Sequence, residues 1–398
     1  MNNIIVYGVL FNGFRLFTGA FAIVYMLESG LSVTDVGFIK AFQAFIIFFL
    51  DVPLGYIADK KSRKLSIVLA SICSAIWLFC MGSASSFFGF IVAEFFNSLS
   101  MTLMGGAYNA LLISHSRLSG SEPKNALSIS HKWNYIGMFA FSLVGALLAD
   151  VIGVLVWYVA GVLMAATAFY GLIILPKDSS LVSENKSKEY QIKKDFGNFI
   201  SILIKNKYIS FLFVSIALLF NLASQYWQVI FENKGIEVLK IELGITFSLL
   251  LLFQSFASNA VNRFSKSTNY FIASILFFLA FGLMIVETEH DKYTAIALTC
   301  LSFFSIRLLL LIVEIDLHEA LEDQFRATYE SFLSTATRAM LFVSFPLFGY
   351  LIETFGYISL GWVFLLIVLA TYSKDIFSIM FGINKRRGLT SAHPETRD

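Results

Sequence analysis

Long apolar runs separated by short polar connections make up almost the whole of this 398-residue chain. A membrane-spanning helix needs roughly 20 mostly apolar residues, and runs of that length recur from one end of the sequence to the other. The pattern predicts twelve transmembrane helices, at residues 4–27, 33–58, 65–84, 86–113, 124–149, 152–175, 208–231, 240–261, 269–287, 293–316, 328–352 and 357–381. We therefore expect an all-α integral membrane protein.

The composition agrees with this pattern. Hydrophobic residues make up 57% of the chain and charged residues 14%, against about 25% charged in a typical soluble domain. The three cysteines lie inside apolar runs, no histidine pair has metal-ligand spacing, and no phosphate-binding loop is present. We expect neither an enzyme nor a cofactor or metal site, no nucleic-acid partner, and a proton gradient rather than ATP as the energy source.

The distribution of basic residues predicts the orientation in the membrane. Most of the 29 Lys and Arg residues lie in connections after even-numbered helices, in the segment 176–207 and in the tail. The opposite ends and loops hold only Lys40, Lys234, Lys240 and Lys292. Because cytoplasmic loops carry the excess of Lys and Arg, we expect a multi-pass protein of a bacterial inner membrane with both termini in the cytoplasm.

A weak internal repeat divides the chain into two halves. Asn262, Arg263, Ser265 and Lys266 follow Asp59, Lys60, Ser62 and Arg63 by 203 positions, and the entries to the fifth and eleventh helices show nearly the same offset. Repeated units of this kind are common in transporters. We predict an N-terminal six-helix bundle at 1–175, a cytoplasmic linker at 176–207, a C-terminal six-helix bundle at 208–382 and a basic tail at 383–398.

The connection after the second helix carries the most specific motif. Asp51, Gly55 and Asp59 share one helical face, and a dense cluster of cations follows them. This stretch resembles the cytoplasmic loop motif of the major facilitator superfamily, Gly-x-x-x-Asp-Arg/Lys-x-Gly-Arg-Lys/Arg. The sequence matches that motif at Gly55, Asp59, Lys60, Arg63 and Lys64, with Ser62 in place of the usual glycine.

The resemblance implies two pseudo-symmetric bundles around a central cavity lined by the first, fourth, seventh and tenth helices. Arg15, Glu94 and Arg307 lie inside three of these helices, where a charge costs about 2.5–3.5 kcal/mol and indicates a function. Polar or aromatic neighbours share or flank the same faces. The candidate substrate and proton cavity is therefore Asn12, Arg15, Glu94, Asn97, Asn221, Gln225, Trp227 and Arg307.

Structural interpretations of these residues stay open. Arg15 and Glu94 could form a fixed pair that only holds helices together, and Arg307 could pair with Glu314 on the same helix. Asn221, Gln225 and Gln228 lie on one face of the seventh helix, where amides serve either substrate contact or helix packing.

A second group of residues belongs to a cytoplasmic gate, as the resemblance implies. We expect Asp51 to pair with Arg338 and Asp59 to lie at the positive N-terminal end of the eleventh helix, so that both contacts hold the outward-facing state. The candidate gate residues are Asp51, Gly55, Asp59, Lys60, Arg63, Lys64 and Arg338.

Together these features favour a secondary active transporter, monomeric in the lipid bilayer, that works by alternating access. Aromatic and amide-rich cavity helices favour proton-coupled export of a small amphiphilic or peptide-like compound, as in drug or antibiotic efflux and self-immunity. The fifth helix offers only Gly137 and Gly145, without the Gly-Pro pair of many proton antiporters, which speaks against antiport. One alternative is proton-coupled uptake of an organic anion or nutrient, and another is a non-transporting sensor or partner subunit.

Overall fold

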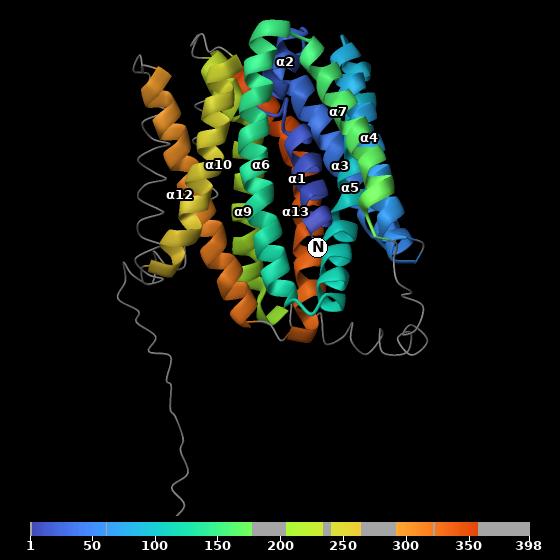
Figure 1. Ribbon diagram of the computed structural model, residues 1–398. Coiled ribbons are helices and arrows are strands. Elements are labelled where there is room, and N and C mark those ends of the chain that lie inside the picture. Colours follow the sequence, from blue (N-terminus) through green and yellow to red (C-terminus); the bar gives the residue numbers. More distant parts are fainter. Residues whose placement is uncertain are drawn as a thin grey trace, which may run out of the picture.

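The computed structural model describes residues 2–60, 62–176, 204–233, 240–263, 292–320 and 323–356. Within these ranges the regular secondary structure is helical throughout (Figure 1). The helices are α1 (Asn2–Arg15), α2 (Ala22–Glu28), α3 (Val33–Lys60), α4 (Arg63–Ser83), α5 (Phe87–Leu118), α6 (Pro123–Ile152), α7 (Leu155–Ile174), α9 (Lys207–Asn233), α10 (Lys240–Arg263), α12 (Lys292–Ala320) and α13 (Asp323–Phe355).

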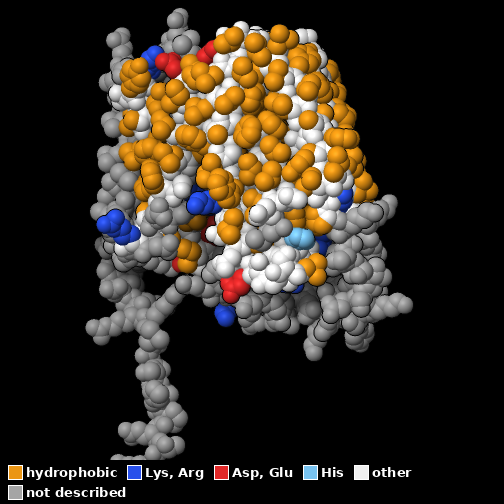
Figure 2. Space-filling model, viewed as in Figure 1, with side chains coloured by type: hydrophobic (Ala, Val, Ile, Leu, Met, Phe, Trp, Pro, Cys, Tyr) orange, Lys and Arg blue, Asp and Glu red, His pale blue; other side chains and the backbone are white. Residues whose placement is uncertain are grey.

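Nine helices in the described part of the chain are long and apolar enough to cross a membrane. With α1 and α2, which together occupy the predicted first helix, they correspond to ten of the twelve predicted helices. The predicted helices at 269–287 and 357–381 lie outside the described residues. Figure 2 shows hydrophobic side chains covering most of the visible face, as expected of a surface in contact with lipid acyl chains.

Short connections with capping residues set the boundaries between several helices. Ser62 precedes α4, and its Oγ accepts a hydrogen bond from the Leu65 N–H at 3.2 Å. Ser86 caps α5 through the Gly89 N–H at 3.3 Å, and Pro123 opens α6. A serine at the N-cap accepts a hydrogen bond from an otherwise unpaired backbone N–H, and a proline in the first turn has no backbone N–H to leave unpaired. Ser62 thus has a local function at the position where the loop motif has glycine.

Among the described helices, three pairs make the main contacts between the part of the chain before residue 177 and the part after residue 203. They are α3 with α13, α6 with α10, and α2 with α9. Figure 1 shows α2 at the top of the bundle, where α6 and α13 end and α3 and α10 begin; we call this the α2 end. In the predicted topology it is the outer end. The division at 176–207 falls mostly outside the described residues and stays a prediction.

The first predicted helix is broken, contrary to the continuous helix expected at 4–27. Helix α1 ends at Arg15, and α2 begins at Ala22. Thr18 and Gly19, in the break, have low helix propensity. In addition, the Phe17 carbonyl points at Gly145 of α6.

The Gln228 side chain of α9 satisfies backbone groups that this break exposes. Its Nε2 donates to the Gly19 carbonyl at 3.3 Å, and its Oε1 accepts from the N–H groups of Ile23 at 3.2 Å and Val24 at 3.4 Å. Inside a membrane such backbone groups need partners within the protein. Gln228 therefore supports irregular backbone at a contact between the two parts of the chain.

Gly145 gives a direct test of this packing. A Cβ at this position would lie 1.8 Å from the Phe17 carbonyl oxygen, so the Gly145→Ala change is expected to destabilise the protein by about 1–3 kcal/mol through overpacking. The measurement is the thermal unfolding temperature of detergent-purified protein. The matched control is Gly105→Ala on α5, where a Cβ meets nothing within 4 Å among the described atoms. Equal unfolding temperatures for the two variants would contradict the close contact.

Candidate functional site

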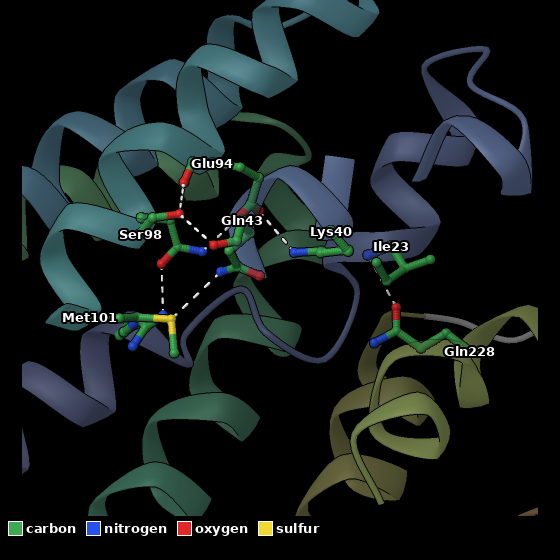
Figure 3. Close-up of polar contacts among 9 residues, drawn as sticks. Ile23, Lys40, Gln43, Glu94, Ser98, Met101 and Gln228 are labelled. Atoms are coloured by element: carbon green, nitrogen blue, oxygen red, sulfur yellow. Dashed lines mark hydrogen bonds and ion pairs between the residues drawn. The ribbon is translucent and has the colours of Figure 1, made fainter. Parts of the chain in front are cut away.

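A buried ion pair joins α3 and α5, about two turns inside the first residue of each helix. The Lys40 Nζ lies 2.8 Å from the Glu94 Oε1, and the two side chains are 9% and 1% exposed. Figure 3 shows these side chains pointing toward each other, with Gln43 and Ser98 beside them. Removing two charges from water is expensive unless they pair closely and fill their remaining hydrogen-bonding positions.

Asn97 connects this ion pair to α1. Its Nδ2 donates to the Glu94 Oε2 at 2.8 Å, and its Oδ1 accepts from the Arg15 Nη2 at 2.7 Å. The Arg15 guanidinium also lies 5.7 Å from the centre of the Trp77 ring, a cation–π distance. Lys40, Glu94, Asn97 and Arg15 therefore form one continuous polar chain across three helices. We call these four residues the charge cluster.

The helical spacing of α5 explains how the sequence forms this cluster. Glu94, Asn97 and Ser98 are three and four positions apart and share a face. The Ser98 Oγ donates to the Glu94 carbonyl at 2.7 Å, which leaves the Glu94 carboxylate free to contact Lys40 and Asn97. One turn further, the Gln43 Nε2 of α3 donates a hydrogen bond to the Met101 Sδ at 3.5 Å. This face of α5 thus packs against α3 through polar side chains.

The charge cluster contains two cations and one carboxylate. Both oxygens of Glu94 are occupied, one by Lys40 and the other by the amide of Asn97. Arg15 makes its hydrogen bond to a neutral amide, so the direct Arg15–Glu94 pair considered from the sequence is not formed. The site therefore carries one more positive than negative charge.

Lys40 is a site residue that the sequence pattern did not indicate, because it was counted among the ends and loops on the predicted outer side. That placement is wrong. Helix α3 begins at Val33, so Lys40 lies two turns inside it and is buried. Its apolar neighbours Ile39 and Ala41, both also buried, were the signal that could have placed it inside the membrane.

Two other predicted cavity residues bond their own helices, and a third packs on a neighbouring helix. Asn12 donates to the Gly8 carbonyl at 2.9 Å, and Asn221 donates to the Ala217 carbonyl at 2.7 Å. Trp227 is buried and stacks on Phe247 of α10 at a centroid distance of 6.5 Å.

Two predicted cavity residues remain without a described function. Gln225 is half-buried, and on α9 it is Gln228 that reaches α2 and the break before it. Arg307 of α12 is also half-buried. Among the described residues Arg307 forms no ion pair with Glu314, which excludes the intrahelical pairing in this conformation. Its contact with substrate stays a prediction.

The predicted gate residues Asp51 and Arg338 lie within electrostatic range of each other. No ion pair joins these two described side chains, and the Arg338 Nε is buried without a hydrogen bond. A Cβ added at Gly55 would meet no described atom within 4 Å. The predicted Asp51–Arg338 contact is therefore not made in this conformation.

The cations of the loop motif contact their own part of the chain. Lys64 Nζ donates to the Leu175 carbonyl at 2.7 Å and so caps the end of α7. Arg63 Nη1 lies 3.5 Å from the Ala110 carbonyl of α5. The side chains of Asp59 and Lys60 lie outside the described part of the structure, so the predicted contact of Asp59 with the eleventh helix stays a prediction.

Comparison with known structures shows the fold. The chain is similar to the nucleoside transporter NupG, with a TM-score of 0.74 and 15% identity over 96% of this chain and 99% of that one. It is also similar to a POT family transporter in complex with 5-aminolevulinic acid, with a TM-score of 0.67 and 15% identity over 95% and 96% of the two chains. A bacterial homologue of the iron transporter ferroportin in an inward-facing state gives a TM-score of 0.65 at 12% identity over 94% and 97%.

No curated protein sequence matches this chain. The model of the Major Facilitator Superfamily matches residues 4–315, which include the charge cluster and Arg307. The likeness in fold to transporters of known structure agrees with that match. The chain is therefore a multi-pass membrane protein that belongs to the Major Facilitator Superfamily of transporters.

Proposed function

We propose that this protein is a proton-coupled secondary transporter in which Glu94 carries the proton and Arg15 contacts an anionic group of the substrate. The observation that carries this proposal is the buried charge cluster with its single carboxylate and two cations. Ionised residues inside a membrane protein mark substrate and proton pathways. The Lys40 ammonium is the charged partner of the Glu94 carboxylate, at 2.8 Å.

The charge balance relates proton binding to substrate binding. A proton on Glu94 removes the negative charge that faces Lys40, which leaves Lys40 and Arg15 both without a charged partner. Two unit charges 4 Å apart interact by about 4 kcal/mol at an effective dielectric constant of about 20. Protonation therefore favours binding of an anion, and a bound anion favours protonation. Proton and anion then travel together, which supports uptake by symport.

Export of a small amphiphilic or peptide-like compound is the second candidate function. Trp77, beside the Arg15 guanidinium, and the amides of Gln43 and Asn97 offer apolar and hydrogen-bonding contacts to such a compound. Export by proton antiport requires that the proton and the substrate bind the site one at a time. A substrate with a cationic group meets this requirement, because that group competes with Lys40 for the Glu94 carboxylate.

Matched acid and amide ligands separate these functions. The structural neighbours include transporters described with nucleosides, 5-aminolevulinic acid and a peptide conjugate. A panel should therefore contain a nucleoside, a dipeptide and 5-aminolevulinic acid, each tested with an analogue in which any carboxylate is replaced by an amide. We expect an acid, and not its amide, to raise the unfolding temperature of the purified protein.

Radiolabelled acid is then given to right-side-out and everted vesicles. Accumulation driven by the proton gradient in right-side-out vesicles supports uptake, and accumulation in everted vesicles supports export. A sensor or partner subunit gives no accumulation in either.

Arg15 is the residue whose replacement tests the substrate contact. In Arg15→Gln protein we expect at least a tenfold weaker binding of the acid, because a charge-assisted hydrogen bond contributes about 1.5–3 kcal/mol. Arg15→Lys keeps the charge and is expected to retain part of the affinity. Arg117, at the C-terminal end of α5, supplies the matched control Arg117→Gln. Unchanged binding in Arg15→Gln would remove Arg15 from the substrate site.

A further inference from the structure

Two carboxylates at the α2 end each form hydrogen bonds between the part of the chain before residue 177 and the part after residue 203. Asp150 of α6 accepts hydrogen bonds from the backbone N–H groups of Lys240 at 3.0 Å and Ile241 at 2.8 Å, the first two residues of α10. Glu353 of α13 accepts from the backbone N–H of Thr34 at 3.2 Å, the second residue of α3, and from its hydroxyl. Each carboxylate therefore caps the N-terminus of a helix from the opposite part of the chain.

The two caps are related by the internal repeat. Glu353 follows Asp150 by 203 positions, the offset found between the two copies of the loop motif. Each residue lies two positions before the last residue of its helix. Each also bonds the second N–H of its target helix, Ile241 in α10 and Thr34 in α3. The same contact has thus been built twice, once on each side of the α2 end.

Neither carboxylate stabilises its own helix. The C-terminal end of a helix carries the negative end of the helix dipole, where an anion is unfavourable, and the N-terminal end is the favourable place. Asp150 and Glu353 stand at the unfavourable ends of α6 and α13, and only the neighbouring helix supplies the favourable one. The contacts therefore stabilise the closed arrangement and are lost when the two parts separate at this end.

Close packing surrounds both caps. A Cβ at Gly349 would lie 2.7 Å from the Val33 carbonyl oxygen, and a Cβ at Gly244 would lie 2.3 Å from the Ala146 Cβ. The Lys240 ammonium adds an ion pair with Glu28 of α2, at 3.4 Å. At this end the two parts of the chain are thus in close contact beside each cap.

We propose that Asp150 and Glu353 are paired latches that hold the α2 end closed during the transport cycle. Opening this end requires both carboxylates to leave their helix N-termini, and closing restores both. The latches set the balance between the two access states whichever solute the protein moves.

Cysteine accessibility tests the latches. In a protein whose Cys73, Cys80 and Cys300 have been replaced, Ala146→Cys places a reporter in the buried α6–α10 contact. Gly105→Cys places a second reporter on the α5 face below Met101, where the surroundings are open. Labelling by a membrane-impermeant maleimide is measured in right-side-out and everted vesicles. The carboxylates are replaced as Asp150→Asn and Glu353→Gln, alone and together.

The double replacement is expected to raise labelling at position 146 roughly tenfold and to lower labelling at position 105, since the population shifts toward the state open at the α2 end. Each single replacement should give a smaller shift in the same direction. The control is Glu122→Gln, since the Glu122 side chain, which precedes α6, bonds only Asn125 of that helix among described residues. An unfolded variant would raise labelling at both positions. Equal labelling in wild-type and double-variant protein, or a rise at both positions, would overturn the proposal.

Discussion

Purified Lys40→Met protein is expected to unfold at a much lower temperature than the wild-type protein. The replacement leaves the Glu94 carboxylate, 1% exposed, without its charged partner in the middle of the helix bundle. Breaking a buried ion pair by removing one partner costs about 3–5 kcal/mol, a large fraction of the stability of most proteins. The measurement is thermal unfolding in detergent at constant pH.

Removing both charges of the pair is expected to restore most of this stability. In Lys40→Met/Glu94→Gln protein neither member of the ion pair is charged any longer, Arg15 keeps its hydrogen bond to Asn97, and the glutamine amide can still accept a hydrogen bond from Asn97 through its oxygen. The double variant should therefore fold but lose proton coupling. If the double variant is no more stable than Lys40→Met, the interaction between Lys40 and Glu94 is not the source of the effect.

A disulfide between α6 and α10 is expected to stop transport. The hydroxyl oxygens of Ser142 and Ser248 lie 3.1 Å apart across this contact, and both side chains are buried. Two cysteines at these positions are close enough for a disulfide bond of about 2.05 Å. The crosslink would hold the α2 end closed, so the oxidised double variant should lose more than nine-tenths of its transport rate and recover it on reduction, because alternating access requires this end to open.

The single variants Ser142→Cys and Ser248→Cys are the controls for this experiment, since neither can form the crosslink. Binding of substrate from the opposite end should persist in the oxidised protein. Full transport by protein shown to be completely crosslinked would mean that α6 and α10 do not separate during the cycle.

The architecture could be predicted from the sequence because membrane helices are recognisable by their length and apolarity. The main error in the fold was the first helix, where Thr18 and Gly19 lie inside an otherwise apolar run. The break depends on partners far away in sequence, the amide of Gln228 and the small surface of Gly145. Periodicity within one segment contains no information about such partners.

The candidate site was predicted only in part. Arg15, Glu94 and Asn97 were chosen because charged and polar residues are costly inside a membrane, and the structure brings these three together. Asn12 and Asn221 were chosen on the same grounds but bond backbone carbonyls of their own helices. Lys40 was counted with the ends and loops because it lies within two turns of the predicted start of its helix at residue 33, which the structure confirms.

The gate shows a different limit of sequence reasoning. Asp51 and Arg338 are placed near each other, as expected, yet their contact is open while the caps at the α2 end are closed. A motif identifies residues that meet in one state of a transporter, but the sequence does not state which state a given structure represents.

Transport by Glu94→Gln protein in proteoliposomes tests the central claim, that Glu94 couples the proton to the substrate. Two assays are run with the acid identified by thermal stabilisation: accumulation driven by an imposed pH gradient, and exchange of labelled for unlabelled substrate without a gradient. We predict that Glu94→Gln protein loses gradient-driven accumulation and keeps exchange. Accumulation at the wild-type level in Glu94→Gln protein would contradict the claim.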